Sequence, residues 1–233
     1  MREGEGPPVV LLPGLQGDPS VFAPLVAHLD GLEVWGGRLS RGGLSIDAAC
    51  LEARLVRQGI ERPRVVCGSY GGQVALRSSQ YFQSLVLTGS FGNWTQLSRR
   101  QRLMLRASLR APSAVLEDRY RAKLTERLVA DGVPEHTAQS IQAPGGAALK
   151  ARLRSLVRQT APALRQPTLW LAGRDDPQAP WSDQAIKSVW SGIETRRVPG
   201  NHRPYASHPA EFAACLKQWW SSVDACNQDT GRI

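Results

Sequence analysis

Residues 65–72 read Val-Val-Cys-Gly-Ser-Tyr-Gly-Gly and join a short apolar run to a helical pattern through a turn of small residues. A serine in such a sharp strand-to-helix turn stands exposed at the carboxyl end of its strand, provided that its neighbours are small. Gly71 and Gly72 meet this requirement after Ser69. In the usual pattern, Gly-x-Ser-x-Gly, the first glycine would fall at Cys67, whose side chain is small enough for the departure to be tolerated. The stretch predicts a strand–turn–helix unit that presents Ser69, although an ordinary connection or a phosphate-binding turn has a similar composition.

Two later segments also place a polar residue just after a predicted strand. A strand expected at 168–172 leads into Asp176, and a strand expected at 194–198 leads into His202. Serine, aspartate and histidine in this chain order fit a nucleophile, an orienting acid and a general base. Open parallel sheets place their sites at the carboxyl ends of the strands, where all three would lie. Asp175 is the alternative acid and His208 the alternative histidine.

Short apolar runs alternate with helical patterns along much of the chain, which predicts a parallel sheet with crossover helices. Further strands are expected at 9–12, 33–35, 64–67 and 84–88. The helix expected at 45–58 carries Ile46, Ala49, Cys50, Ala53 and Val56 on one face, and we expect that face to be buried.

Residues 91–165 interrupt the alternation with helical patterns alone. The expected fold is therefore α/β, a mostly parallel sheet of about six strands flanked by helices. Residues 1–90 and 166–233 would form this core, and residues 91–165 an inserted helical lid. A length of 233 residues fits one domain with such an insert.

The positive charge of the chain is concentrated in the expected lid. Residues 91–165 hold 14 of the 29 bases but only 5 of the 20 acids, so their excess equals the net charge of +9. This is either a general preference for arginine on solvated faces or a basic surface for anionic substrates or an acidic partner, since guanidinium groups pair well with phosphate and carboxylate. Nucleic-acid binding is disfavoured because few aromatic residues lie among these arginines and no recognised motif is present.

Several other classes of protein are also disfavoured. No apolar run approaches the length of a membrane span, and the start of the chain lacks the apolar run of a signal peptide, which favours a cytoplasmic protein. The four cysteines show no metal-binding spacing, so a zinc site is disfavoured.

Together these segments resemble the α/β-hydrolase superfamily, over about residues 9–220, and in particular its esterase and thioesterase-like members with a small helical lid. The resemblance implies that Ser69 is the nucleophile and His202 the general base. It implies Asp176 as the acid, since Gly173 and Asp176 fit the Gly-x-x-Asp pattern of the family. It also implies that the chain lacks the two leading strands of the larger fold.

The resemblance further implies an oxyanion hole made by the backbone N–H groups of Leu15 and Tyr70, to which Gln16 could add a side-chain donor. The arrangement of a basic lid is similar to that of esterases of biotin synthesis, which recognise acyl carrier protein. By this likeness an acidic carrier protein or coenzyme A would carry the acyl group. The substrate-binding residues would include Arg99, Arg100 and Arg102.

The expected function is hydrolysis of a small-molecule carboxylic ester or thioester through an acyl-enzyme, without a metal or organic cofactor. A second interpretation is a non-catalytic binding protein on the same fold. The stretch 84–93 and the Gly200-Asn201 pair resemble maspardin-like proteins, which are regarded chiefly as binding proteins. The presence of His202 favours the enzyme.

Overall fold

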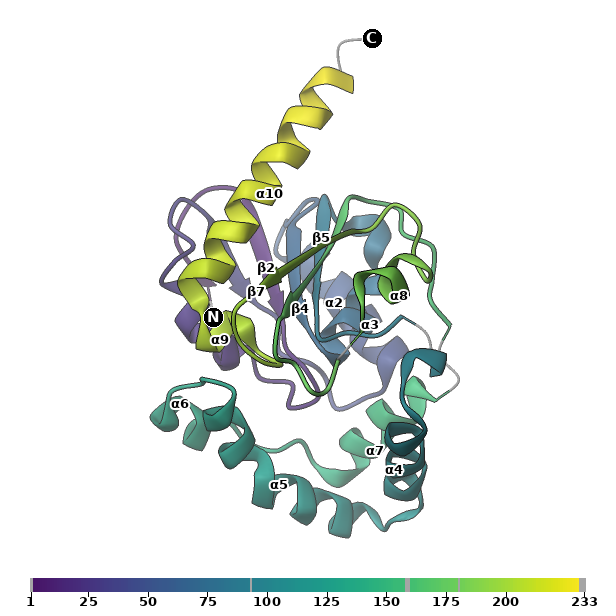
Figure 1. The fold of residues 1–233 in the computed structure, drawn as a ribbon. Coiled ribbons are helices and arrows are strands. Elements are labelled where there is room, and N and C mark those ends of the chain that lie inside the picture. Colours follow the sequence, from purple (N-terminus) through teal and green to yellow (C-terminus); the bar gives the residue numbers. More distant parts are fainter. Residues whose placement is uncertain (1, 93, 158–159, 180, 231–233) are drawn as a thin grey trace.

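The protein is a single twisted sheet with helices on both faces (Figure 1). The computed structural model describes residues 2–92, 94–157, 160–179 and 181–230. Seven strands are hydrogen-bonded in the order β1-β3-β2-β4-β5-β6-β7. They are β1 Arg2–Glu3, β2 Pro8–Leu12, β3 Glu33–Gly36, β4 Arg64–Gly68, β5 Ser84–Thr88, β6 Thr168–Gly173 and β7 Glu194–Val198.

The α/β class and the mostly parallel sheet are confirmed, with one strand more than the sequence predicts. Strand β1 pairs antiparallel with β3, whereas every other pair of neighbours is parallel. β1 has two exposed residues at the edge of the sheet, so it has no apolar run by which to recognise it. Arg2 pairs there with Glu33 of β3.

Ten α-helices accompany the strands in the described part of the chain. They are α1 Ala23–Val26, α2 Leu44–Arg57, α3 Tyr70–Arg77, α4 Arg99–Arg110, α5 Ser113–Ala130, α6 Glu135–Ser140, α7 Gly146–Leu156, α8 Asp183–Lys187, α9 Pro204–Ser207 and α10 Pro209–Thr230. Alternate residues of the central strands enter two separate cores, as the pleat requires. In β4, Val65 and Cys67 pack in the core that includes α2 and α3, while Val66 packs in the core that includes α10.

The prediction for the buried face of α2 is wrong. Ile46 and Val56 are 58% and 75% exposed, and the helix instead buries a stripe that includes Leu44 and Leu51. That stripe also contains Asp47, which is 2% exposed. The periodicity of apolar residues does not predict such a stripe, because an acid interrupts it. The partners that allow this acid to be buried lie elsewhere in the fold.

Helices α4 to α7 lie together beyond one end of the sheet, below it in Figure 1, and α10 runs out past the opposite end. Within this group, α5 packs against α6 and α7. All described secondary structure between β5 and β6 is helical, as expected for residues 91–165. No described helix combines the length and the apolar composition needed to cross a membrane.

Candidate functional site

Ser69 occupies a strained turn between β4 and α3. Its φ of 50° and ψ of −114° lie outside the regions that side-chain-bearing residues usually adopt. Hydrogen bonds to the end of β5 and to the segment that follows it hold the turn. The Ser69 N–H donates to the Thr88 carbonyl at 2.7 Å, and the Ser90 hydroxyl donates to the Ser69 carbonyl at 2.7 Å. Strain of this kind persists only where the surroundings enforce it, and it is concentrated at functional sites.

Small residues around Ser69 are required by close contacts. A Cβ on Gly71 would lie 2.5 Å from the carbonyl oxygens of both Leu12 and Pro13, and a Cβ on Gly68 would lie 2.8 Å from the Tyr205 hydroxyl. Cys67 is fully buried within the sheet, and burial raises the pKa of its thiol well above the ordinary value. Its thiol therefore stays protonated near neutral pH, which makes it a poor nucleophile.

His202 and Asp176 form a buried pair. His202 Nδ1 lies 2.9 Å from Asp176 Oδ2, and the two residues are 6% and 5% exposed. The other carboxylate oxygen, Oδ1, accepts hydrogen bonds from the backbone N–H groups of Gln178 at 2.7 Å and Ala179 at 3.1 Å. Burial alone would raise the pKa of Asp176, but the hydrogen bond with His202 and the two N–H groups bring it below its ordinary value. The ionised carboxylate can orient the imidazole with its proton on Nδ1, leaving Nε2 free to accept one.

Gly89, at the end of β5, makes room for this imidazole. Its φ is +59°, and a Cβ at this position would lie 2.5 Å from Cε1 and 2.9 Å from Nδ1 of His202. This residue was not among those predicted from the sequence. The signal was present, since a glycine directly after a parallel strand indicates either a tight turn or a close approach.

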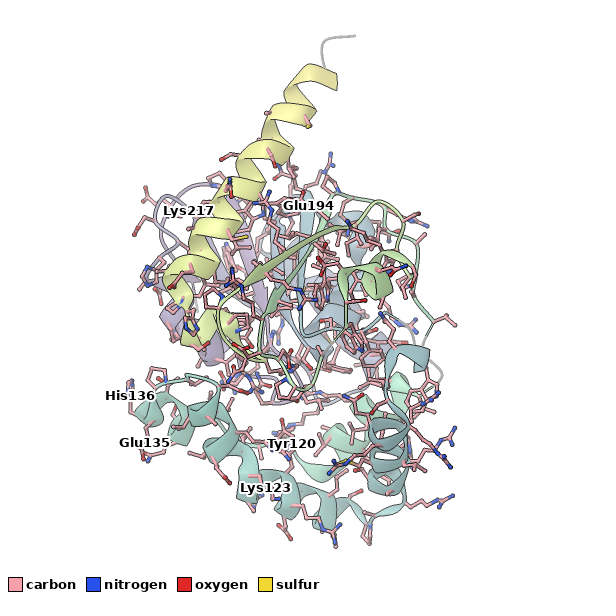
Figure 2. The ribbon with its side chains drawn as sticks, viewed as in Figure 1. Tyr120, Lys123, Glu135, His136, Glu194 and Lys217 are labelled. Atoms are coloured by element: carbon pink, nitrogen blue, oxygen red, sulfur yellow. The ribbon has the colours of Figure 1, made fainter. Side chains whose placement is uncertain are left out.

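Ser69 and His202 line the same cavity of about 80 Å³. The loop after β2 and helix α5 close over it, and Figure 2 shows Tyr120 pointing from α5 toward the core. The remaining wall residues are Gly14, Leu15, Gln16, Leu124, Arg127, Gln178, Arg203 and Tyr205. No hydrogen bond joins Ser69 Oγ to His202 in the part of the chain that the structure describes. In unliganded sites such bonds are often long and tighten only with substrate.

Of the two residues expected to supply the oxyanion donors, Leu15 lines the same cavity as Ser69, and Tyr70 is the next residue in the chain. Leu15 lies in a turn closed by the hydrogen bond from the Gly17 N–H to the Gly14 carbonyl, 3.0 Å long. Tyr70 directly follows Ser69, and its buried hydroxyl donates to Asp47 at 2.9 Å. Gln16 is 4% exposed, and its amide nitrogen has no hydrogen-bond partner among the described residues. A buried donor without a partner at the wall of a cavity is available to a ligand.

The arginines of the cavity differ from those expected by sequence. Arg127 and Arg203 line it, from α5 and from the loop after β7. Arg203 pairs with Asp131, whereas Arg127 has no ion-pair partner among the described side chains. The three arginines predicted as substrate-binding lie outside this cavity, on α4: Arg99, Arg100 and Arg102. The spacing of Tyr120, Leu124 and Arg127, which share one helical face, was the signal that sequence analysis passed over.

The alternatives left open by the sequence lie elsewhere. Asp175 is exposed, and its N–H donates to the Gly200 carbonyl, so Asp176 is the carboxylate at His202. His208 Nδ1 contacts the hydroxyl of Ser207 and does not line the cavity. Across the described residues, no group of three or more His, Cys, Asp or Glu side chains is arranged to hold a metal ion.

A second cavity of about 650 Å³ lies beside the first and shares Gln16 with it. Its wall is largely polar and joins the loop after β3 to the first turn of α7. It includes Arg38, which pairs with Asp18 at 2.6 Å, and Arg41, which has no ion-pair partner among the side chains described. The two cavities together offer a small chamber at Ser69 and a larger polar one next to it.

Comparison with known proteins places the chain in a family. The model of the Alpha/beta hydrolase family matches residues 9–215. A search of curated proteins finds no match. Three similar solved structures are an esterase from Thermogutta terrifontis (18% identity, 96% of this chain and 92% of that chain, TM-score 0.77), an esterase from Exiguobacterium antarcticum (15%, 94% and 93%, 0.75) and an enol-lactonase from Burkholderia xenovorans (16%, 95% and 95%, 0.73). At this identity the solved structures show only that the fold is shared. The family model matches most of the chain, so the chain belongs to the alpha/beta hydrolase family.

Proposed function

We propose that the protein is a serine hydrolase that cleaves a carboxylic ester or thioester through an acyl-enzyme, with Ser69, His202 and Asp176 as its triad. The observation that carries the proposal is the 2.9 Å pairing of His202 Nδ1 with Asp176 at the wall of the cavity that also holds Ser69. The positive φ of Ser69 supports the proposal further, because the nucleophile of this family stands on a strained turn.

The mechanism follows from these positions. His202 Nε2 takes the hydroxyl proton of Ser69 as its oxygen attacks the acyl carbon, and Asp176 stabilises the imidazolium that forms. The backbone N–H groups of Leu15 and Tyr70 bind the negative oxygen of the tetrahedral intermediate. The imidazolium then gives its proton to the leaving alcohol or thiol, and the carbon–oxygen or carbon–sulfur bond breaks. Water, deprotonated by the same imidazole, attacks the acyl-enzyme; the bond between the acyl carbon and Ser69 Oγ then breaks, and the imidazolium returns the proton to Oγ as the acid leaves.

We assign the acyl group to the small cavity and the leaving group to the large one. A volume of about 80 Å³ fits a short acyl chain, and Arg127 at its wall favours an acyl group with an anionic end. The larger cavity, about 650 Å³, with Arg41 on its wall, suits a polar or anionic leaving group such as a coenzyme A thioester. In this proposal residues 91–165 act as a lid, since α5 supplies Tyr120, Leu124 and Arg127 to the wall.

The first experiment is intact-mass analysis after reaction with a fluorophosphonate, a reagent that labels activated serines. One adduct is expected on wild type and on the control Ser188→Ala, which removes an exposed hydroxyl from the end of α8. Ser69→Ala should carry none. Folded wild type without an adduct would contradict the proposal and would favour a non-catalytic binding protein on the same fold.

A second experiment tests whether a carrier protein docks on α4. Reversal of charge at Arg99, Arg100 and Arg102 should reduce hydrolysis of esters linked to acyl carrier protein relative to free esters, because an acidic carrier would lose its basic contacts. The matched control reverses the exposed Lys187 and Lys217, which lie on α8 and α10. An unchanged ratio in the arginine variant would remove the carrier protein from the proposal and leave the hydrolase in place.

A further inference from the structure

Arg152 is the exception among the bases of residues 91–165. It lies on α7 and is 2% exposed, whereas the other described bases of this segment are exposed or half-buried. A guanidinium group so deeply buried must find partners for its charge and its donors, because it is always protonated. Its partners therefore show which parts of the core are joined to α7.

Those partners lie in two loops of the sheet core and on α2. Arg152 Nη1 donates to the Leu15 carbonyl at 2.5 Å, and Nη2 donates to the Ser40 carbonyl at 2.5 Å. Arg152 Nε lies 3.5 Å from Oδ2 of Asp47, whose side chain is fully buried; the two form an ion pair without a hydrogen bond from Nε. Gly17 permits the approach, since a Cβ there would lie 2.9 Å from Nη1 and 3.0 Å from Nη2.

Asp47 carries the contact onward to the turn at Ser69. Its Oδ2 also accepts the hydroxyl of Tyr70 at 2.9 Å, and its Oδ1 accepts the hydroxyl of Ser40 at 2.6 Å. Burial raises the pKa of the Tyr70 phenol, so this hydroxyl remains a donor. One ion pair thus contacts both Leu15 and Tyr70, the two residues whose N–H groups are the proposed oxyanion donors.

We propose that Arg152 and Asp47 are positioning residues that hold the two oxyanion donors in place, which couples the seating of α7 to the competence of Ser69. The inference rests on the proposed function. Leu15 and Gln16 are the central residues of the Gly14–Gly17 turn. Arg152 binds the carbonyl of the peptide between them, and this peptide adjoins the Gly14–Leu15 peptide that carries the proposed donor N–H. Tyr70 is held through its side chain, leaving its N–H to face the reacting oxygen.

The test compares Arg152→Met with the control Arg154→Met, which removes an exposed arginine from the same helix. For Arg152→Met, kcat on a free ester should fall about 10- to 100-fold with little change in KM, as expected when donors to the transition state are misplaced. Binding of a boronic acid that forms a tetrahedral adduct with Ser69 should weaken by the same factor. A folded Arg152→Met with wild-type kcat, or with a loss confined to KM, would overturn the proposal.

Hydrogen exchange gives a readout that needs no catalysis. The amides of residues 12–18 should exchange faster in Arg152→Met than in wild type or Arg154→Met, because the turn loses its anchor. Unchanged exchange in folded protein would overturn the anchoring even if the enzyme proves active. Absence of fluorophosphonate labelling in wild type would instead overturn the proposed function, so the two failures are distinguishable.

Tyr70→Phe keeps the test decisive if loss of the buried charge prevents folding. This substitution removes the hydroxyl that donates to Asp47. It leaves the Arg152–Asp47 pair in place and keeps the backbone N–H at position 70. We expect a lower kcat at unchanged KM and faster exchange of the amides at 69–72. If neither changes, Asp47 does not position Tyr70 and the proposal fails.

Discussion

Gly89 and His202 are in such close contact that a methyl group on the glycine would lie 2.5 Å from the Cε1 atom of the imidazole. The contact joins the end of β5 to the loop after β7, and it fixes where the ring can lie above the sheet. The hydrogen bond with Asp176 sets which ring nitrogen meets the carboxylate, and Gly89 limits how closely the ring approaches the end of β5.

We therefore expect Gly89→Ala to reduce kcat by at least about 100-fold, because the added methyl group forces the imidazole away from its position. The control is Gly59→Ala, at a φ of +62° with no atom within 4 Å of the added carbon. It imposes similar backbone strain, costs about 1 kcal/mol of unfolding free energy and should leave kcat unchanged. Equal activity losses in the two variants would mean that strain, rather than displacement of His202, is responsible.

Replacement of Asp176 by asparagine should lower kcat about 1,000- to 10,000-fold while preserving the volume of the side chain. The amide stabilises the tautomer with the proton on Nε2, which cannot accept the proton of Ser69. Asp175→Asn is the matched control, since Asp175 is the exposed neighbour. Steady-state kinetics on one ester would show the difference. Comparable losses in both variants would leave Asp176 without a special role.

The lowered pKa of Asp176 also predicts how stability depends on pH. A carboxyl group whose pKa in the folded state is below the ordinary value of 3.8 stabilises the fold above that value. This contribution is lost as the pH falls through the folded-state pKa. Urea unfolding of wild type and Asp176→Asn, from about pH 6 to about pH 2.5, should give a stability difference that shrinks toward acid. A constant difference across this range would contradict the prediction.

Cys67 stands where the usual motif has glycine, and we expect Cys67→Ala to retain kcat within about twofold because the thiol is buried and protonated. Its free energy of unfolding should fall by about 1 kcal/mol, from lost packing in the sheet. Iodoacetamide should not inactivate folded wild type. Inactivation that Cys67→Ala prevents would show instead that this thiol is reactive.

Much of the fold could be predicted from local pattern. Most of the parallel strands are short apolar runs, although β7 is not, and the helices at 91–165 lack any such run. Strand β1 could not be found this way, because two exposed residues form it only by pairing with β3. The buried face of α2 was missed because Asp47 breaks its apolar stripe, and the partners that make this burial tolerable are distant in sequence.

The candidate site divides in the same manner. Ser69, Asp176 and His202 each follow a strand, so sheet topology alone predicts that they lie near one another, and the structure brings them together. Their catalytic roles stay predictions. Arg152 was counted only as part of a basic segment, since its hydrogen bond to Leu15 joins residues 137 positions apart and leaves no local trace.

The burial of Arg152 against the sheet core bears on how such proteins can be recombined. Helices α4 to α7 form a continuous stretch of chain, so they look like a segment that could be exchanged between members of the family. A chimera that receives foreign helices without this arginine would leave Asp47 as an unpaired buried charge and the Leu15 carbonyl without its donor. Productive crossover points must therefore transfer α7 together with α2 and the loop after β2, although these segments are far apart in the gene.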